Sequence, residues 1–231
     1  MDDNMKKNQV VTTEDILLKL CKSVSGVLTA ASASDVTYSA MVQKINKTAL
    51  KPDFGCFVLF DGGFSGLVVI NFTAKAALEL YTNYMRNMGM PEDELAVLHT
   101  SDEVGDVLGE LMNQIVGDFT NKIRKDLQTN ITQNQPKMLS LNKQVILSVD
   151  TNLDRPQARR VTFSTAKNNI FYLELAMDKT EFIQLEEFEV QEDESPDSIL
   201  EAARNKESAK TAAKSSEDET GSSDLLDELG I

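Results

Sequence analysis

The sequence predicts an α+β domain in which two α-β-β-β units form one sheet packed against long helices, followed by a disordered acidic tail. Two observations predict the domain: residues 15–26 and 106–117 are similar amphipathic stretches with apolar residues at helical spacing, and three strand-like segments follow each stretch. A third predicts the tail, because no aromatic residue follows Phe188 and the chain becomes rich in Glu, Ser, Ala, Lys and Asp.

The first unit begins with a helix that Thr13 caps and that extends to about Ala31. The strands that follow are expected at 36–45, 54–60 and 66–72. Between the last two, the residues 61–65 (Asp-Gly-Gly-Phe-Ser) have the composition of a turn, so these strands are predicted to form a hairpin. A further helix is expected at about 74–89, before Pro91.

The second unit begins with the longest expected helix, at about 101–128, where Thr100 and Glu103 have the spacing of a capping box. Its strands are expected at 137–149, 159–166 and 169–177. When residues 15–26 are set over 106–117, the Asp, two leucines and the final Gly coincide. Any two amphipathic helices share a leucine pattern, but the matching strand order on both sides favours a duplication.

The composition is that of a globular protein and excludes several classes of function. The 231 residues are 41% hydrophobic and 26% charged, which suffices for a core. The net charge of −14 disfavours nucleic acid and anionic membranes as partners, because both require a basic patch. No apolar run approaches the roughly 20 residues that span a bilayer, and no secretory signal is visible. Cys21 and Cys56 lack metal-like spacing, so we expect a protein of the reducing cytoplasm.

The acidic residues divide the chain into three expected parts. Residues 186–231 hold 15 of the 37 acidic residues and only 4 of the 23 basic ones. We therefore expect a folded domain at 1–190 and a disordered acidic linker at 191–221. Leucines return in residues 222–231, where a short amphipathic docking peptide is expected.

One polar feature of the second unit stands out. At about 100° per residue, Asp106, Glu110, Asn113 and Gly117 fall within an arc of roughly 60°, opposite the apolar face of the helix. Such a face is often only a solvated surface. The glycines at 105, 109 and 117 argue against this interpretation, because each costs about 0.5–1 kcal/mol relative to alanine in a helix. They suggest close approach by another backbone or by a partner.

This pattern, with Pro136 further along the chain, resembles the signature of the CheC/CheX/FliY family of bacterial chemotaxis phosphatases. That family dephosphorylates the response regulator CheY. Members similar to CheC carry the Glu-x-x-Asn motif in both duplicated helices, whereas those similar to CheX keep one copy. The first helix here has Lys19 and Lys22 where the acid and the amide would be, so the chain resembles the single-site, CheX-like case.

The resemblance implies a role for each motif residue. Glu110 would pair with the active-site lysine of a phosphorylated CheY-like regulator, and Asn113 would orient the attacking water. Asp106, Gly117 and Pro136 would support the motif. The protein would need no metal or cofactor of its own, since the regulator is expected to hold Mg²⁺. Some CheX proteins dimerise, so a homodimer is left open.

A second resemblance lies in the last residues of the chain, which are similar to the CheY-binding peptide of the unrelated phosphatase CheZ. The residues that would bind the partner are Asp224, Leu225, Leu226, Leu229 and Ile231. The sequence thus implies a phosphatase that hydrolyses the aspartyl phosphate of a CheY-like regulator and docks it through this peptide. The alternative is a non-catalytic binding module for a phosphorylated receiver domain or a flagellar-switch component.

Overall fold

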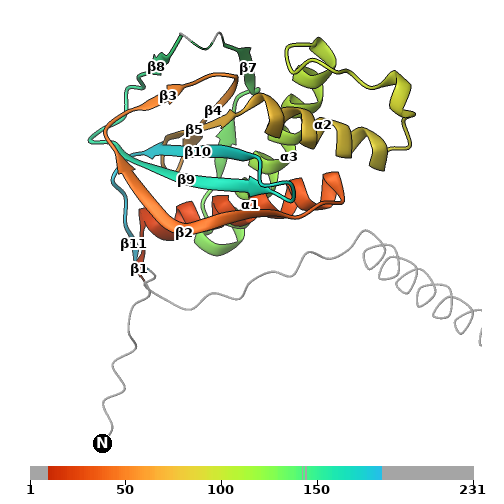
Figure 1. The fold of residues 1–231 in the computed structure, drawn as a ribbon. Helices are drawn as coiled ribbons and strands as arrows, with labels where there is room; N and C mark the ends of the chain where they lie inside the picture. The colour runs from red at the N-terminus through yellow and green to blue at the C-terminus, as the bar shows by residue number, and fades with distance from the viewer. Residues whose placement is uncertain (1–9, 142, 144, 184–231) are drawn as a thin grey trace, which may run out of the picture. The chain divides into compact units, whose positions relative to one another are not determined.

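The computed structural model describes residues 10–141, 143 and 145–183, and Figure 1 shows their arrangement. The expected linker at 191–221 and peptide at 222–231 lie outside the described residues. The helices are α1 (Thr13–Ser32), α2 (Ala74–Asn87) and α3 (Asp102–Leu127), with a 3₁₀ turn at Glu92–Glu94. The strands are β1 (Val10–Val11), β2 (Val36–Ile45), β3 (Thr48–Leu50), β4 (Phe54–Gly62), β5 (Gly66–Phe72), β6 (Ile131–Gln133), β7 (Lys137–Ser140), β8 (Leu147–Val149), β9 (Gln157–Thr165), β10 (Ile170–Met177) and β11 (Phe182–Ile183).

The main sheet is antiparallel and shows the duplication in its topology. Its strand order is β2-β9-β10-β5-β4-β6, and β7 also pairs with β4. Each strand of the first unit has a counterpart in the second: β2 corresponds to β6 and β7, β4 to β9, and β5 to β10. From either edge of the sheet, corresponding strands therefore follow in the same order. The central pair is β5 with β10, where Ile70 lies opposite Leu173. The predicted α+β fold with duplicated α-β-β-β units is therefore confirmed, as is the hairpin of β4 and β5.

The long helices α1 and α3 pack against one face of this sheet and run in opposite directions (Figure 1). Two polar contacts fix their alignment: Lys19 of α1 pairs with Asp126 of α3, and Lys122 Nζ of α3 donates to Ser23 Oγ of α1 at 3.2 Å. Between the helices and the sheet lies the main core, which includes Leu20, Val24, Val58, Ile70, Leu111, Ile115, Phe119 and Leu173. Each such side chain stabilises the fold by about 1.5–3 kcal/mol.

The opposite face of the sheet is covered by the antiparallel pair β3 and β8, which we call the outer ribbon. A second apolar cluster lies beneath it, formed by Leu50, Leu67, Val69, Leu141, Ala158 and Ala176. Because both faces of the sheet are covered here, β5 is buried along its whole length. This explains why its sequence is a continuous apolar run rather than an alternation.

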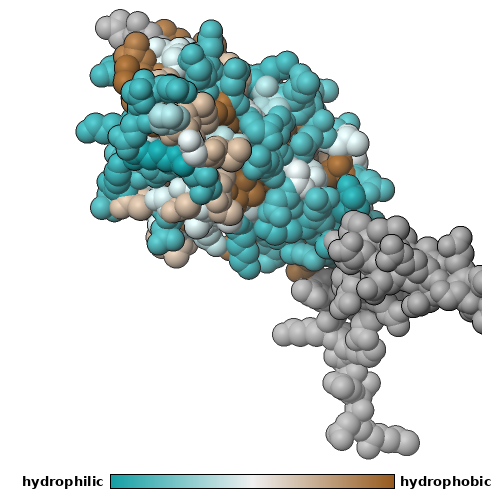
Figure 2. All heavy atoms as spheres, turned by 90° about the vertical axis from the view of Figure 1, so that its right-hand side faces the viewer, coloured by the Kyte–Doolittle hydropathy of each residue, from teal (hydrophilic) through white to brown (hydrophobic). Residues whose placement is uncertain are grey.

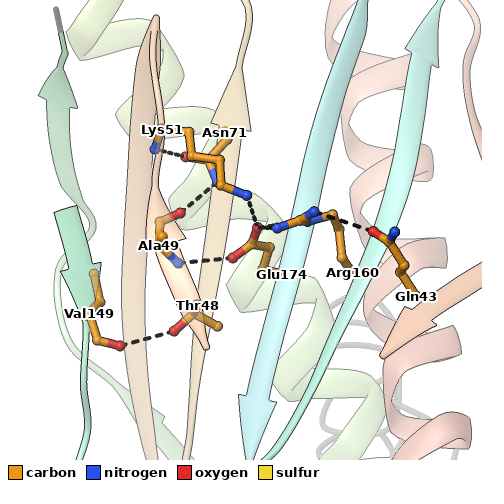
Figure 3. A network of polar contacts seen from close by, with 8 residues as sticks. All are labelled: Gln43, Thr48, Ala49, Lys51, Asn71, Val149, Arg160 and Glu174. Carbon is orange, nitrogen blue, oxygen red and sulfur yellow. Dashed lines mark hydrogen bonds and ion pairs between the residues drawn. The ribbon is translucent and has the colours of Figure 1, made fainter. Parts of the chain in front are cut away.

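A buried carboxylate joins the outer ribbon to the sheet (Figure 3). Glu174 of β10 is wholly buried, and its oxygens accept hydrogen bonds from Ala49 N at 3.0 Å, Lys51 Nζ at 3.2 Å and Arg160 Nε at 2.8 Å. Asn71 of β5 pairs with the same segment, since its Nδ2 donates to Ala49 O at 2.9 Å. A buried charge is tolerated only when it is paired in this way.

The cap of α1 differs from the prediction by one residue. The N-cap is Thr12, not Thr13, and the helix begins at Thr13. Asp15 Oδ2 accepts hydrogen bonds from both the backbone N–H and the hydroxyl of Thr12, each at 2.8 Å. These bonds lower the pKa of the Asp15 carboxyl. The predicted acidic first turn of the helix is therefore present, and the capping residue that Asp15 contacts is Thr12 instead of Thr13.

The cap of α3 is also displaced. The predicted capping box of Thr100 and Glu103 is wrong, because α3 begins at Asp102 and its N-cap is Ser101. Ser101 N–H donates to Leu98 O at 3.1 Å. This turn holds Ser101 in an extended conformation just before the helix, so Thr100 lies one residue too early to cap it.

The predicted strand at 137–149 is wrong, because it is two strands in different layers. Lys137–Ser140 pairs with β4 of the main sheet, whereas Leu147–Val149 pairs with β3 of the outer ribbon. Just after β7, Leu141 N–H donates a hydrogen bond to the carbonyl oxygen of Asp53, the residue before β4, at 2.9 Å. The short strands β3 and β6 were not predicted either.

Replacing the buried carboxylate tests how much the outer ribbon depends on it. We expect Glu174→Ala to lower the free energy of unfolding by about 2–4 kcal/mol, because two cations and a backbone amide lose their acceptor. The measurement is urea denaturation followed by circular dichroism. The control is Asp93→Ala at an exposed position, for which a change of about 0.5 kcal/mol or less is expected. Equal effects of the two substitutions would contradict the proposed role of Glu174.

Candidate functional site

The three polar motif residues of α3 lie on its exposed face. Asp106, Glu110 and Asn113 are all exposed to solvent. The apolar residues of α3 lie on the opposite side and are at most 2% exposed, namely Val104, Leu108, Leu111, Ile115 and Phe119. The core contacts of α3 are therefore complete without the polar residues, which remain available for contacts with another molecule.

An open groove of about 300 Å³ lies beside this face, between α3 and the segment 135–138, and we call it the α3 groove. It is lined by Gly105, Asp106, Gly109, Glu110, Asn113, Gln135, Pro136 and Met138. The structure thus brings Asp106, Glu110, Asn113 and Pro136 together, although Pro136 comes from a different part of the chain. Gly117, the remaining motif residue, lies on α3 outside the groove lining.

The far wall of the groove is a β-bulge. β6 and β7 pair with the two ends of β4, and between them two residues of β4 face the three residues 134–136. Asn134 keeps the ladder connected: its N–H donates to Leu59 O at 3.1 Å, and its Oδ1 accepts from Leu59 N–H at 3.0 Å. The extra residue directs Gln135 and Pro136 to the groove, as bulges on edge strands commonly do.

The groove has an acidic side. Asp106 and Glu110 contribute two carboxylates, and the lining contains no Lys, Arg or His. Gln114 Nε2 donates to Glu110 Oε1 at 3.0 Å, which holds this carboxylate along the helix and leaves its second oxygen unpaired within the described residues. A cationic group of a ligand or partner is therefore the favoured neighbour of this side.

The helix glycines do not serve close packing within the chain. A methyl group at Gly109 would lie 3.6 Å from Met138 Cγ, and one at Gly105 would lie 3.8 Å from Phe54 Cζ, both ordinary van der Waals distances. A methyl group at Gly117 would meet no atom within 4 Å. The interpretation that another backbone of this chain approaches closely is thus wrong. Gly105 and Gly109 instead keep the α3 groove open at a cost in helix stability.

The first unit holds different residues at the corresponding positions. Lys19 forms an ion pair with Asp126 of α3, so its ammonium group is part of the contact between the helices. Lys22 is exposed on α1. β2 is also irregular at this place, but there the three residues 39–41 face the single residue Thr162 of β9, an excess of two residues rather than one. The architecture is repeated, but no acid or amide is present on α1 at the motif positions.

Other reactive groups lie away from the groove. Cys21 and Cys56 are buried in the main core, and burial raises the pKa of Cys21 to about 12 and also raises that of Cys56. Both thiols are therefore protonated at neutral pH and are poor nucleophiles. His99 lies between α2 and α3 and does not line the groove. The expected partner-binding residues Asp224, Leu225, Leu226, Leu229 and Ile231 lie outside the described residues.

Sequence comparison matches the chain to one family model. The model is described as "Protein of unknown function (DUF3334)", and it matches residues 7–231. No curated protein sequence matches the chain. Among the described residues, no helix is both long and apolar enough to traverse a lipid bilayer.

Structural comparison shows the fold. The chain is similar to the chemotaxis protein CheX from Desulfovibrio desulfuricans, with a TM-score of 0.59 and 15% identity, covering 71% of this chain and 99% of that one. It is also similar to a CheC-like superfamily protein from Shewanella sp. PV-4, with a TM-score of 0.58 and 18% identity, covering 71% of this chain and 97% of that one. A chain of the CheX–CheY–BeF3–Mg²⁺ complex from Borrelia burgdorferi is similar with a TM-score of 0.53 and 16% identity, covering 71% of this chain and 99% of that one. These likenesses confirm the CheC/CheX/FliY-like fold that the resemblance predicted.

Proposed function

This chain belongs to the DUF3334 family, and we propose that it is a phosphatase that hydrolyses the aspartyl phosphate of a CheY-like response regulator. One observation carries the proposal: Glu110 and Asn113 are exposed on a helix whose core face is complete without them, beside an open groove that also includes Asp106 and Pro136. The fold supports it, since one protein with this fold is found in a complex with CheY.

The proposed reaction is the hydrolysis of an acyl phosphate. The oxygen of a water molecule attacks phosphorus, the bond between phosphorus and the aspartate oxygen breaks, and the products are the free carboxylate and dihydrogen phosphate. Asn113 would enter the regulator's site and hold the water in line. An amide suits this task because its oxygen accepts a hydrogen bond while its nitrogen donates one. Positioning is the main contribution that a protein makes to phosphoryl transfer.

Glu110 would dock the helix through charge. The carboxylate is exposed and is oriented by Gln114, so it can pair with a lysine at the regulator's active site. The Mg²⁺ that neutralises the phosphoryl charge would belong to the regulator, and this chain would contribute no metal or cofactor. No general acid is needed, because the carboxylate leaves without a proton. Both protons of the attacking water stay on the dihydrogen phosphate, so the proposal includes no general base either.

The alternative is a binding module that holds a phosphorylated receiver or a flagellar-switch component without turnover. The two differ in stoichiometry. If the protein is an enzyme, amounts far below those of the phosphorylated regulator accelerate loss of its phosphate. If only stoichiometric amounts change the phosphorylation level, the protein is a binding module. We favour catalysis because a docking surface alone has no use for an amide beside the acid.

The first variant to examine is Asn113→Ala. We expect turnover of the phosphorylated regulator to fall by a factor on the order of 10², because the group that positions the water is removed. Binding and the free energy of unfolding are expected to change little, since the side chain is exposed. Asn121→Ala, an exposed asparagine on the same helix, serves as the control. Full activity of Asn113→Ala would overturn the proposed mechanism.

Gly109→Ala separates stability from function. The added methyl group makes only an ordinary contact with Met138, so the variant should gain about 0.5–1 kcal/mol of stability from helix propensity. It also narrows the α3 groove, so the Michaelis constant for the regulator should rise severalfold. Gly26→Ala on α1, where a methyl group meets nothing within 4 Å, should be stabilised without kinetic change. Thermal unfolding and steady-state kinetics measure both effects, and unchanged kinetics for Gly109→Ala would exclude the groove from docking.

We further propose that residues 222–231 supply affinity through Leu225, Leu226 and Leu229. If residues 191–221 are disordered, as their composition predicts, a linker of ~30 residues would have an average span of roughly 30 Å, comparable to a receiver domain. Tethering would give the second contact an effective concentration of up to about 1 mM. Deleting 222–231 should then raise the Michaelis constant about tenfold and leave the saturated rate near normal. Steady-state kinetics unchanged by the deletion would show that the peptide has another purpose.

A further inference from the structure

We propose that Gln135 is a second amide of the α3 groove, and that its Nε2–H donates a hydrogen bond to the phosphoryl group of the docked regulator. The inference rests on the proposed function and adds a residue that the helix motif does not contain. It would make the far wall of the groove part of the site, with the acid and amide of α3 on one side and Gln135 on the other.

The first argument is the placement of the side chain. Gln135 occupies the bulge between β6 and β7, where the extra residue takes it out of the ladder and into the lining of the groove. Its neighbour Asn134 anchors the bulge with two hydrogen bonds to Leu59. The position of Gln135 is therefore fixed by the sheet and not by a free loop, which is the condition for a residue that must meet a reacting group.

The second argument is charge. The phosphoryl group is anionic, and the α3 side of the groove holds the carboxylates of Asp106 and Glu110, which would repel it. Within the described residues, the Gln135 amide makes no hydrogen bond, so its N–H groups are free to donate. A docked regulator would thus be oriented by both walls, with its lysine toward the acids and its phosphoryl oxygens toward the amide.

The third argument is the comparison of the two units. Both edge strands are bulged at this place, with three residues opposite one in β2 (Ser39, Ala40 and Met41) and three opposite two in the second unit (Asn134, Gln135 and Pro136). The bulge is therefore a feature of the fold. The amide at its centre is found only in the unit whose helix also carries Glu110 and Asn113, and the unit with Lys19 and Lys22 has an alanine there.

The experiment measures turnover of a phosphorylated CheY-like regulator by the full chain and by its variants. Gln135→Ala should lower kcat/KM about tenfold, which corresponds to one lost hydrogen bond to a charged group. Gln135→Glu should be slower still, because a carboxylate cannot donate and repels the phosphoryl group. Gln133→Ala, exposed on β6 and outside the groove lining, should have the normal rate.

Binding provides a readout that is independent of turnover. Gln135→Ala should weaken binding to the regulator loaded with beryllofluoride, a phosphoryl mimic, and leave binding to the unmodified regulator unchanged. Equal affinity of the variant and the parent chain for the beryllofluoride form would overturn the inference. A normal kcat/KM for Gln135→Ala, with Asn113→Ala inactive, would also overturn it and leave the proposed function intact. Absence of turnover by the parent chain would instead overturn the proposed function.

Asn134 serves as the matched test of positioning. Asn134→Ala removes the acceptor for Leu59 N–H and should lower kcat/KM in the same direction as Gln135→Ala. Asn134→Asp restores an acceptor and should recover most of the rate. If Asn134 acts through Gln135, the double alanine variant should be no slower than Gln135→Ala alone. Additive effects in this cycle would overturn the assigned route.

Discussion

Burial of the apolar face of α3 against the sheet and α1 fixes the rotation of this helix about its axis, because Leu111, Ile115 and Phe119 are almost wholly removed from solvent. A rotation that exposed this face would cost about 1.5–3 kcal/mol for each large side chain. Glu110 and Asn113 are held outward as a consequence, on the same side as the bulged edge of the sheet. The hydrophobic core thus sets the direction in which the polar residues point, and the groove arises where that direction meets the edge strand. The face of the domain that is visible in Figure 2 is largely hydrophilic, with small apolar areas.

The parts of the fold that follow a regular period could be predicted from the sequence. The predicted strand limits at 36–45 and 66–72 agree with β2 and β5, since hydrophobic spacing and turn residues bound these segments on both sides. The exposed face of α3 was predictable for the same reason. The outer ribbon was not, because β3 and β8 are three residues each and their pairing joins segments distant in sequence. The bulge escaped prediction as well, since an extra residue is visible only against the partner strand, and Gln135 was missed with it.

The two units show how a repeated architecture comes to hold a single candidate site. In the second unit the outward face of the helix carries an acid and an amide. In the first, Lys19 pairs with Asp126 and so contributes to the contact between α1 and α3. The ammonium group of Lys19 is thus directed toward α3, in a partly exposed ion pair of the kind that contributes about 0–1 kcal/mol. The first unit thus supplies support for the second, and the symmetry of the sheet persists where the symmetry of the surface does not.

The outer ribbon has a consequence for the order in which the chain acquires its structure. β3 lies in the first unit and β8 in the second, and the bonds that hold them join residues separated by 101 positions for Thr48 with Val149 and by 125 for Ala49 with Glu174. Contacts of such separation form late, since the entropy of closing the loop must be offset first. A nascent chain that has emerged only through α2 therefore has an uncovered apolar sheet face. We therefore expect that neither unit folds when it is excised, because each provides one strand of the cover that the other requires.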